Sequence, residues 1–73
     1  MRIKYDPTVD VLMIYLREGT YAISEEVAPG MIVDLDDEHR PLRIEILDAS
    51  HTLELDSGVQ LEVLPMVLSQ AAV

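Results

Sequence analysis

Residues 4–16 read KYDPTVDVLMIYL, and this stretch joins a turn to an apolar run. Pro7 has its φ fixed near the value that the second position of a β-turn requires, and Asp6 can accept hydrogen bonds from the backbone just beyond. Residues 9–16 are rich in β-branched side chains and apolar on both faces, which favours a strand that needs cover on both sides. We therefore expect this strand to lie centrally in a sheet.

Two aspartates, Asp6 and Asp10, stand four positions apart in this stretch and allow two interpretations. An acid–base pair would need environments that separate the two pKa values, which usually requires burial beside a substrate cleft. Both residues flank a proline turn at a sheet edge, where solvent is expected. The pattern favours turn chemistry, in which Asp6 caps the turn and Asp10 marks the start of the strand.

Four further segments alternate polar and apolar residues, as half-buried strands do. They cover residues 2–5, 20–27, 31–36 and 42–46, and Gly19, Pro29, Gly30 and Pro41 lie in the turns between strands. The residues expected to face inward in the last two are Met31, Val33, Leu35, Leu42, Ile44 and Ile46. Short turns predict an antiparallel meander of about five strands, in which the first three strands follow one another as neighbours.

The pattern changes after Leu47. Asp48 is a good N-cap residue, so a short helix is predicted near residue 48. Beyond it, apolar residues at period two around residues 56–58 favour a C-terminal hairpin or extended segment over a continued helix, although the sequence leaves residues 52–73 open between helix and hairpin. The predicted fold class is α+β.

The length of 73 residues allows one small domain, residues 1–73, with no second core. A chain this short buries only about 60% of the surface of its unfolded form, so the monomer should be only marginally stable unless a further interaction stabilises it. There is no cysteine, while 49% of the residues are hydrophobic. Self-association into a homodimer fits this composition best.

Five basic against fourteen acidic residues give a net charge of −9, with no Lys or Arg after Arg43. Phosphate backbones would be repelled, so nucleic acid is not an expected partner, whereas a basic protein would be attracted. No apolar run approaches the length needed to cross a bilayer, and no membrane association is expected. Cysteine absence suits a reducing cytoplasm.

The residues offer little positive support for catalysis. No nucleophile motif surrounds any serine, and the three glycines are scattered singly, so no phosphate-binding loop is present. His39 and His51 do not form a zinc pattern, and the acidic run of residues 34–38 lacks the spacing of a calcium loop. We expect no catalytic residues, no cofactor and no metal, and interpret the acidic run as a solvated hairpin end.

The sequence supports an interaction surface better than it supports a catalytic site. A meander with one helical turn cannot cover both faces of residues 9–16, so either the C-terminal segment or a partner chain must do so. Acidic side chains would steer the encounter with a basic partner. The candidate residues of this surface are Glu25, Glu26, Asp34, Asp36, Asp37 and Glu38.

Several segments together resemble one family. These are residues 5–7 (YDP), 10–16 (DVLMIYL), 24–27 (SEEV) with Pro29 and Gly30, 32–36 (IVDLD) and 44–50 (IEILDAS). In combination they are similar to the small prokaryotic domains of unknown function of the DUF2283 family, over residues 2–50. The resemblance implies a small β-rich domain with a helical element after residue 48 and no assigned activity. Genes of the family often lie beside small toxin-like proteins, which suggests an antitoxin role by association.

These observations favour a protein-binding module, in the form of an antitoxin-like partner of a small basic toxin. Two alternatives stay open. One is a structural homodimer without catalytic activity, and the other is a small metal-binding protein or enzyme that uses Asp6, Asp10 or the carboxylates of residues 34–38.

Overall fold

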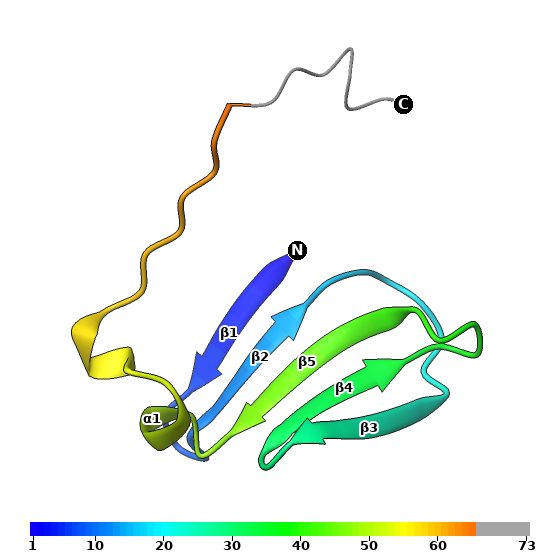
Figure 1. The fold of residues 1–73 in the computed structure, drawn as a ribbon, viewed down its shortest axis with the longest axis horizontal. Helices are drawn as coiled ribbons and strands as arrows, with labels where there is room; N and C mark the ends of the chain where they lie inside the picture. The colour runs from blue at the N-terminus through cyan, green and yellow to red at the C-terminus, as the bar shows by residue number, and fades with distance from the viewer. Residues whose placement is uncertain (66–73) are drawn as a thin grey trace.

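Five antiparallel strands form a single sheet in the computed structural model, which describes residues 1–65 (Figure 1). The elements are β1 (Arg2–Asp6), β2 (Val11–Tyr15), β3 (Ile23–Ala28), β4 (Met31–Leu35), β5 (Pro41–Leu47), α1 (Ala49–Thr52) and a 3-10 helix, η1 (Leu55–Ser57). The five antiparallel strands and the short helix after Asp48 confirm the sequence prediction. With one helix of four residues, the described chain is mostly β.

The strand order is β1-β2-β5-β4-β3, so β3 lies at the opposite edge from β1 and does not neighbour β2. The expectation that the first three strands follow one another was therefore wrong. The loop after β2 crosses the sheet end instead of turning back: the Leu16 N–H donates to the Leu42 carbonyl at 2.9 Å, and the Ala22 N–H donates to the Leu35 carbonyl at 2.8 Å. The sheet consists of a β1–β2 hairpin joined to a β3-β4-β5 meander.

Side-chain pairing explains why β5 inserts beside β2. Leu12 lies opposite Ile46, and Ile14 lies opposite Ile44, so the apolar rows of the two strands meet on one face. Such apolar pairs between β2 and β5 stabilise the sheet. If β3 lay beside β2 instead, its acidic residues could not form pairs of equal strength with the apolar residues of β2. As predicted, β2 lies inside the sheet, between β1 and β5.

The turn between β1 and β2 has the chemistry that the sequence indicates. The Thr8 N–H donates to Asp6 Oδ1 at 2.9 Å, and the Thr8 hydroxyl donates to the same oxygen at 2.5 Å. These bonds lower the pKa of the Asp6 carboxyl, because they favour its charged form. Asp6 is a capping residue of the turn.

The chain after α1 does not form the hairpin that was one of the two predicted alternatives. Asp56 and Ser57, expected at the hairpin turn, lie in η1, and residues 59–65 are extended without strand pairing among the described residues. Figure 1 shows these residues leading away from the sheet. Residues 66–73, the end of the predicted domain, lie outside the described residues. No helix within residues 1–65 is long and apolar enough to cross a membrane.

Candidate protein-binding surface

One face of the sheet is apolar almost from edge to edge. Directly opposed residues share a face in an antiparallel sheet, and the register places one apolar set together across the strands. We call this set the apolar face; it contains Ile3, Tyr5, Leu12, Ile14, Ile23, Met31, Val33, Leu35, Leu42, Ile44 and Ile46. Every inward-facing residue predicted for β4 and β5 belongs to it.

The apolar face is covered only in part. Ala49 of α1 is fully buried against Leu12 and Ile46, and Leu53 and Leu55 pack against the same cluster. Figure 1 shows α1 and η1 at one end of the sheet, and no second layer of helices or strands from residues 1–65 over the rest. No large side chain among residues 1–65 is completely buried. The helix therefore covers one corner of a surface that extends across five strands.

Coverage decreases toward both edges of the sheet. Ile3 on β1 is 48% exposed and Ile23 on β3 is 43% exposed, whereas Leu42 at the far end is 7% exposed. Leu42 is covered by the loop after β2: a Cβ at Gly19 would lie 2.6 Å from its Cδ2 atom. A side chain at position 19 would thus require the Leu42 side chain or the loop to shift.

The opposite face carries charges. The Arg2 guanidinium lies 4.2 Å from the centre of the Tyr15 ring, and the Arg43 guanidinium lies 5.8 Å from it. Arg43 Nε also donates to Asp34 Oδ2 at 2.6 Å, and the Ser24 hydroxyl donates to Asp34 Oδ1 at 2.7 Å. On this face of β2, the Tyr15 ring is consequently covered by two arginines rather than by an apolar layer.

Asp34 was expected to be solvated, and this expectation was wrong. Its exposed fraction is 2%, because Arg43 and Ser24 enclose the carboxylate. Burial by itself would raise the pKa of Asp34, but the hydrogen bonds from Ser24 and Arg43 outweigh it, so this pKa lies below its usual value. Burial and the neighbouring Asp34 charge raise the pKa of Glu45.

Asp36 is also buried, with 3% of its surface exposed, against the expectation of a solvated residue. Its Oδ1 accepts from the backbone N–H groups of Glu38 and Arg40, and its Oδ2 accepts from Arg40 Nε at 2.8 Å. The Arg40 backbone bond is the main cause of the lowered pKa of Asp36. Asp36 shapes the β4–β5 turn, in which His39 has a positive φ of 61°.

The predicted interaction surface is therefore divided. Glu25, Glu26, Asp37 and Glu38 are exposed, while Asp34 and Asp36 are enclosed by arginines and cannot act as free charges. Glu25 lies opposite Val33 on the apolar face, and Asp37 and Glu38 belong to the β4–β5 turn. The four exposed carboxylates do not form one patch. They lie on β3 and in the turn after β4, and their role in binding stays a prediction.

Asp10 has a contact that sequence reasoning missed. Its Oδ1 accepts from the Ser50 N–H at 3.0 Å and its Oδ2 from the Ser50 hydroxyl at 2.7 Å, so it caps α1 from 40 positions away. Asp48, the predicted N-cap, occupies the cap position but makes no side-chain capping bond. The Ser50 bonds and the Tyr5 hydroxyl, 2.8 Å from Oδ1, lower the pKa of Asp10.

Asp10, Asp48 and His51 bring three possible metal ligands within 4.8 Å of one another. One nitrogen and two oxygens suit a divalent transition metal. The Asp10 oxygens, however, already accept three hydrogen bonds, and Asp48 and His51 are largely exposed. The arrangement is explained by its part in holding α1 to β2. Asp6 and Asp10 make separate contacts, Asp6 with Thr8 and Asp10 with Ser50, and no acid–base pairing joins them.

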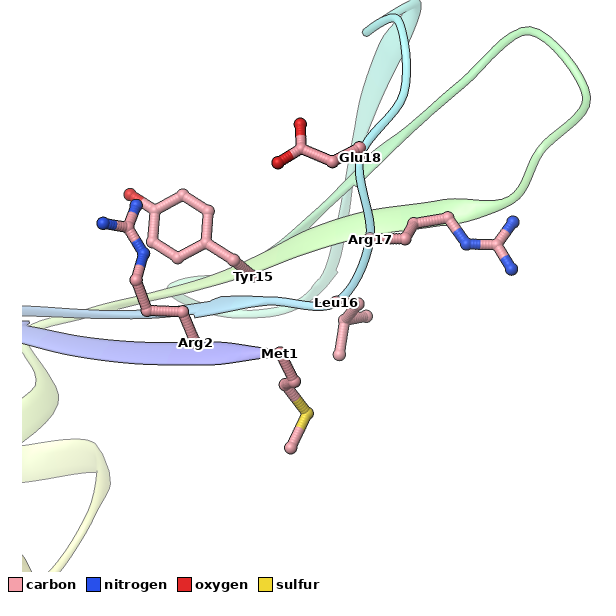
Figure 2. A pocket seen from close by; sticks show the side chains of 6 residues that line it. All are labelled: Met1, Arg2, Tyr15, Leu16, Arg17 and Glu18. Carbon is pink, nitrogen blue, oxygen red and sulfur yellow. The ribbon is translucent and has the colours of Figure 1, made fainter.

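A shallow hollow of about 340 Å³ lies where β1 begins and β2 ends. Its lining residues are Met1, Arg2, Tyr15, Leu16, Arg17 and Glu18. Figure 2 shows Arg2 beside the Tyr15 ring and Arg17 pointing away from both. Because the polar groups do not converge, the hollow lacks the arrangement of a small-molecule site.

Residues 2–50 match the family model described as "Protein of unknown function (DUF2283)". This match covers most of the chain and confirms the resemblance. No curated protein and no solved structure shows significant similarity to the chain.

Proposed function

Since the chain belongs to the DUF2283 family, whose description assigns no activity, we propose from the geometry that it is a non-catalytic protein-binding module. The observation that carries this proposal is the apolar face, which α1 covers at one corner only. A sheet with one hydrophobic face must bury that face against a second layer. Another polypeptide laid on the apolar face would provide this layer.

The exposed edges of the apolar face offer the area for such a contact. Ile3, Tyr5 and Ile23 are each more than a third exposed. Between them, four residues are half-buried and four are buried; the half-buried ones are Ile14, Met31, Val33 and Ile44. Contiguous apolar surface of this kind usually marks a protein-binding site in a soluble domain. Burying the remaining half of an isoleucine contributes about 1 kcal/mol, so a few such residues suffice for measurable affinity.

The net charge of −9 favours a basic partner. Four exposed carboxylates would speed the encounter with a positively charged protein. They are Glu25 on the apolar face, Glu26 on the opposite face of β3, and Asp37 and Glu38 in the β4–β5 turn. The specific form of the proposal is an antitoxin-like partner of a small basic toxin. Its support is the charge and the apolar face, together with the gene association noted for the family.

A structural homodimer is the second candidate, and a separate observation favours it. No large side chain is fully buried in residues 1–65, so the isolated chain has a weak core for its length. Two copies packed through their apolar faces would form a two-layer sandwich with the usual spacing of about 10 Å between sheets.

The test is affinity capture of the tagged protein from its host at physiological and at high salt, with light scattering on the purified chain. The apolar-face variant is Ile23→Ser, and its matched control is Val9→Ser, which changes an exposed residue in the β1–β2 turn. A small basic protein that binds the wild type and Val9→Ser, is released by salt and fails to bind Ile23→Ser is the expected result.

Two other outcomes have definite meanings. A basic partner that binds Ile23→Ser as well as the wild type would show that the apolar face is not the contact. A homodimer with no captured partner would reject the toxin-binding form and leave the structural homodimer. A monomer at high concentration that captures nothing would reject both candidates.

A further inference from the structure

Residues 59–64 have the properties of a strand without a partner. Val59, Leu61 and Val63 alternate with Gln60 and Glu62, and Figure 1 draws this segment as an elongated trace leading from η1. The apolar side chains are 72–75% exposed, and residues 59–65 make no backbone hydrogen bond within the described part of the chain. Period-two alternation with β-branched residues is what an edge of a sheet accepts as an added strand.

The sheet offers two edges, β1 and β3. On β3 the added strand would meet Glu25 and Glu26, which repel Glu62, and the register shift between Glu26 and Ala28 interrupts regular pairing. The other edge has the opposite character. On β1, Arg2 and Lys4 supply positive charge on one face, and Ile3 and Tyr5 extend the apolar face on the other.

One antiparallel register matches residues 3–5 of β1 with residues 61–63 in both charge and apolar character. If Lys4 lies opposite Glu62, then Ile3 lies opposite Val63 and Tyr5 lies opposite Leu61. Lys4 and Glu62 would form one pair of opposite charge on one face, where Arg2 would lie opposite Leu64. Apolar residues would pair on the other face. Each such cross-strand pair stabilises an antiparallel sheet. The new strand would also cover the exposed side of Ile3, which is 48% exposed.

We propose that residues 59–64 of one copy pair antiparallel with β1 of a second copy, and that the exchange is reciprocal. Gly58, at φ 90°, directs the chain away from its own sheet after η1 (Figure 1). A twofold axis lets each copy give one segment and accept one, which closes the assembly as a dimer. This proposal does not rest on binding through the apolar face, because the added strand would contact that face only at its β1 edge.

Disulfide trapping tests the exchange, because the chain has no cysteine of its own. Lys4→Cys and Glu62→Cys are prepared as separate proteins, mixed and oxidised. Side chains directly opposite in an antiparallel pair lie close enough for a disulfide. The expected product is a cross-linked dimer containing one copy of each variant, identified by intact mass. The matched control mixes Glu26→Cys on β3 with Glu62→Cys, and this mixture should give little cross-link.

A variant that carries both Lys4→Cys and Glu62→Cys in one chain shows whether residues 59–64 pair with β1 of the same copy or of a second copy. A cross-linked monomer as its main product would overturn the proposal, because the segment would then pair with its own β1. Equal cross-linking through Glu26→Cys, or none at Lys4→Cys, would also overturn it. Ile23→Ser, the apolar-face variant, should cross-link as the parent does, so that failure of the proposed function and failure of the exchange are distinguishable.

Charge reversal provides a second measurement without oxidation. Glu62→Lys should lose dimer in light scattering, because it places a positive charge opposite Lys4. Adding Lys4→Glu to the same chain should restore the dimer. Full retention of the dimer in Glu62→Lys would contradict the proposed register.

Discussion

Ile46→Ala should remove a large part of the stability of this domain. Ile46 is 5% exposed and lies between Leu12 and Met31 beneath Ala49 of α1. The substitution removes three carbon atoms, about 2.4 kcal/mol at about 0.8 kcal/mol per carbon. The cavity left under a helix of four residues collapses only in part, which brings the expected loss to about 2.5–4 kcal/mol.

That loss is severe for a chain of this size. At about 0.05–0.15 kcal/mol per residue, the free energy of unfolding is about 4–11 kcal/mol in total. The melting temperature should therefore fall by about 10–30 °C. Urea unfolding followed by circular dichroism measures the change, at several protein concentrations so that self-association is recognised.

Ile23→Ala is the matched control, since it makes the same substitution on the same face at a site that is 43% exposed. It should cost about 1 kcal/mol in the monomer. Equal losses for the two variants at low protein concentration would refute the reasoning, because they would show that α1 does not protect Ile46. A loss at Ile23 that grows with protein concentration would indicate that another copy covers this position.

Three further changes test the polar contacts and the close approach of the β2–β3 loop. The pKa of Asp34 is lowered in the fold, so the charged carboxylate stabilises the native state above pH 4. This stabilisation is lost as the pH falls through the pKa of the folded state. In acid titrations, the free energy of unfolding of Asp34→Asn should therefore decline less steeply below pH 4 than that of the wild type. Asp10→Ala should lower the melting temperature and speed amide exchange at Ser50, measured by NMR, because its cap on α1 is lost; unchanged exchange would contradict the capping role. Gly19→Ala should cost about 1 kcal/mol in urea unfolding, because the new Cβ would lie 2.6 Å from Leu42 Cδ2; no loss would mean that the loop moves freely.

Local patterns in the sequence were sufficient to predict the strands. Alternation in residues 31–36 and 42–46 correctly assigned the inward side chains, because side-chain direction in a strand follows from period two alone. The turn at Asp6 and Pro7 was also predictable, since its hydrogen bonds reach only to Thr8. Apolar residues beyond α1 at period two favoured a hairpin, which residues 52–65 do not form, because nothing local identifies a partner strand.

The candidate site was less predictable, because its contacts join distant residues. Asp34 and Asp36 alternate outward and look solvated, yet Arg43 and Arg40 enclose them. Arg43 follows Asp34 by nine positions and faces it only because β5 pairs with β4. Asp10 caps α1 through hydrogen bonds from Ser50, 40 positions away, and no local sequence pattern predicts a contact over that distance.

The sequence by itself determined the five strands, the turn at Asp6 and Pro7, the inward rows and the excess of negative charge, since each depends on neighbouring residues or on composition. Only the tertiary structure decided that β5 separates β2 from β4, that two arginines bury two aspartates, and that residues 1–65 place no complete second layer over the apolar face. The physical reason is that pairing between distant strands is chosen by the total fit of side chains and hydrogen bonds across the sheet. That sum depends on all five strands together, and no short stretch of the chain contains it.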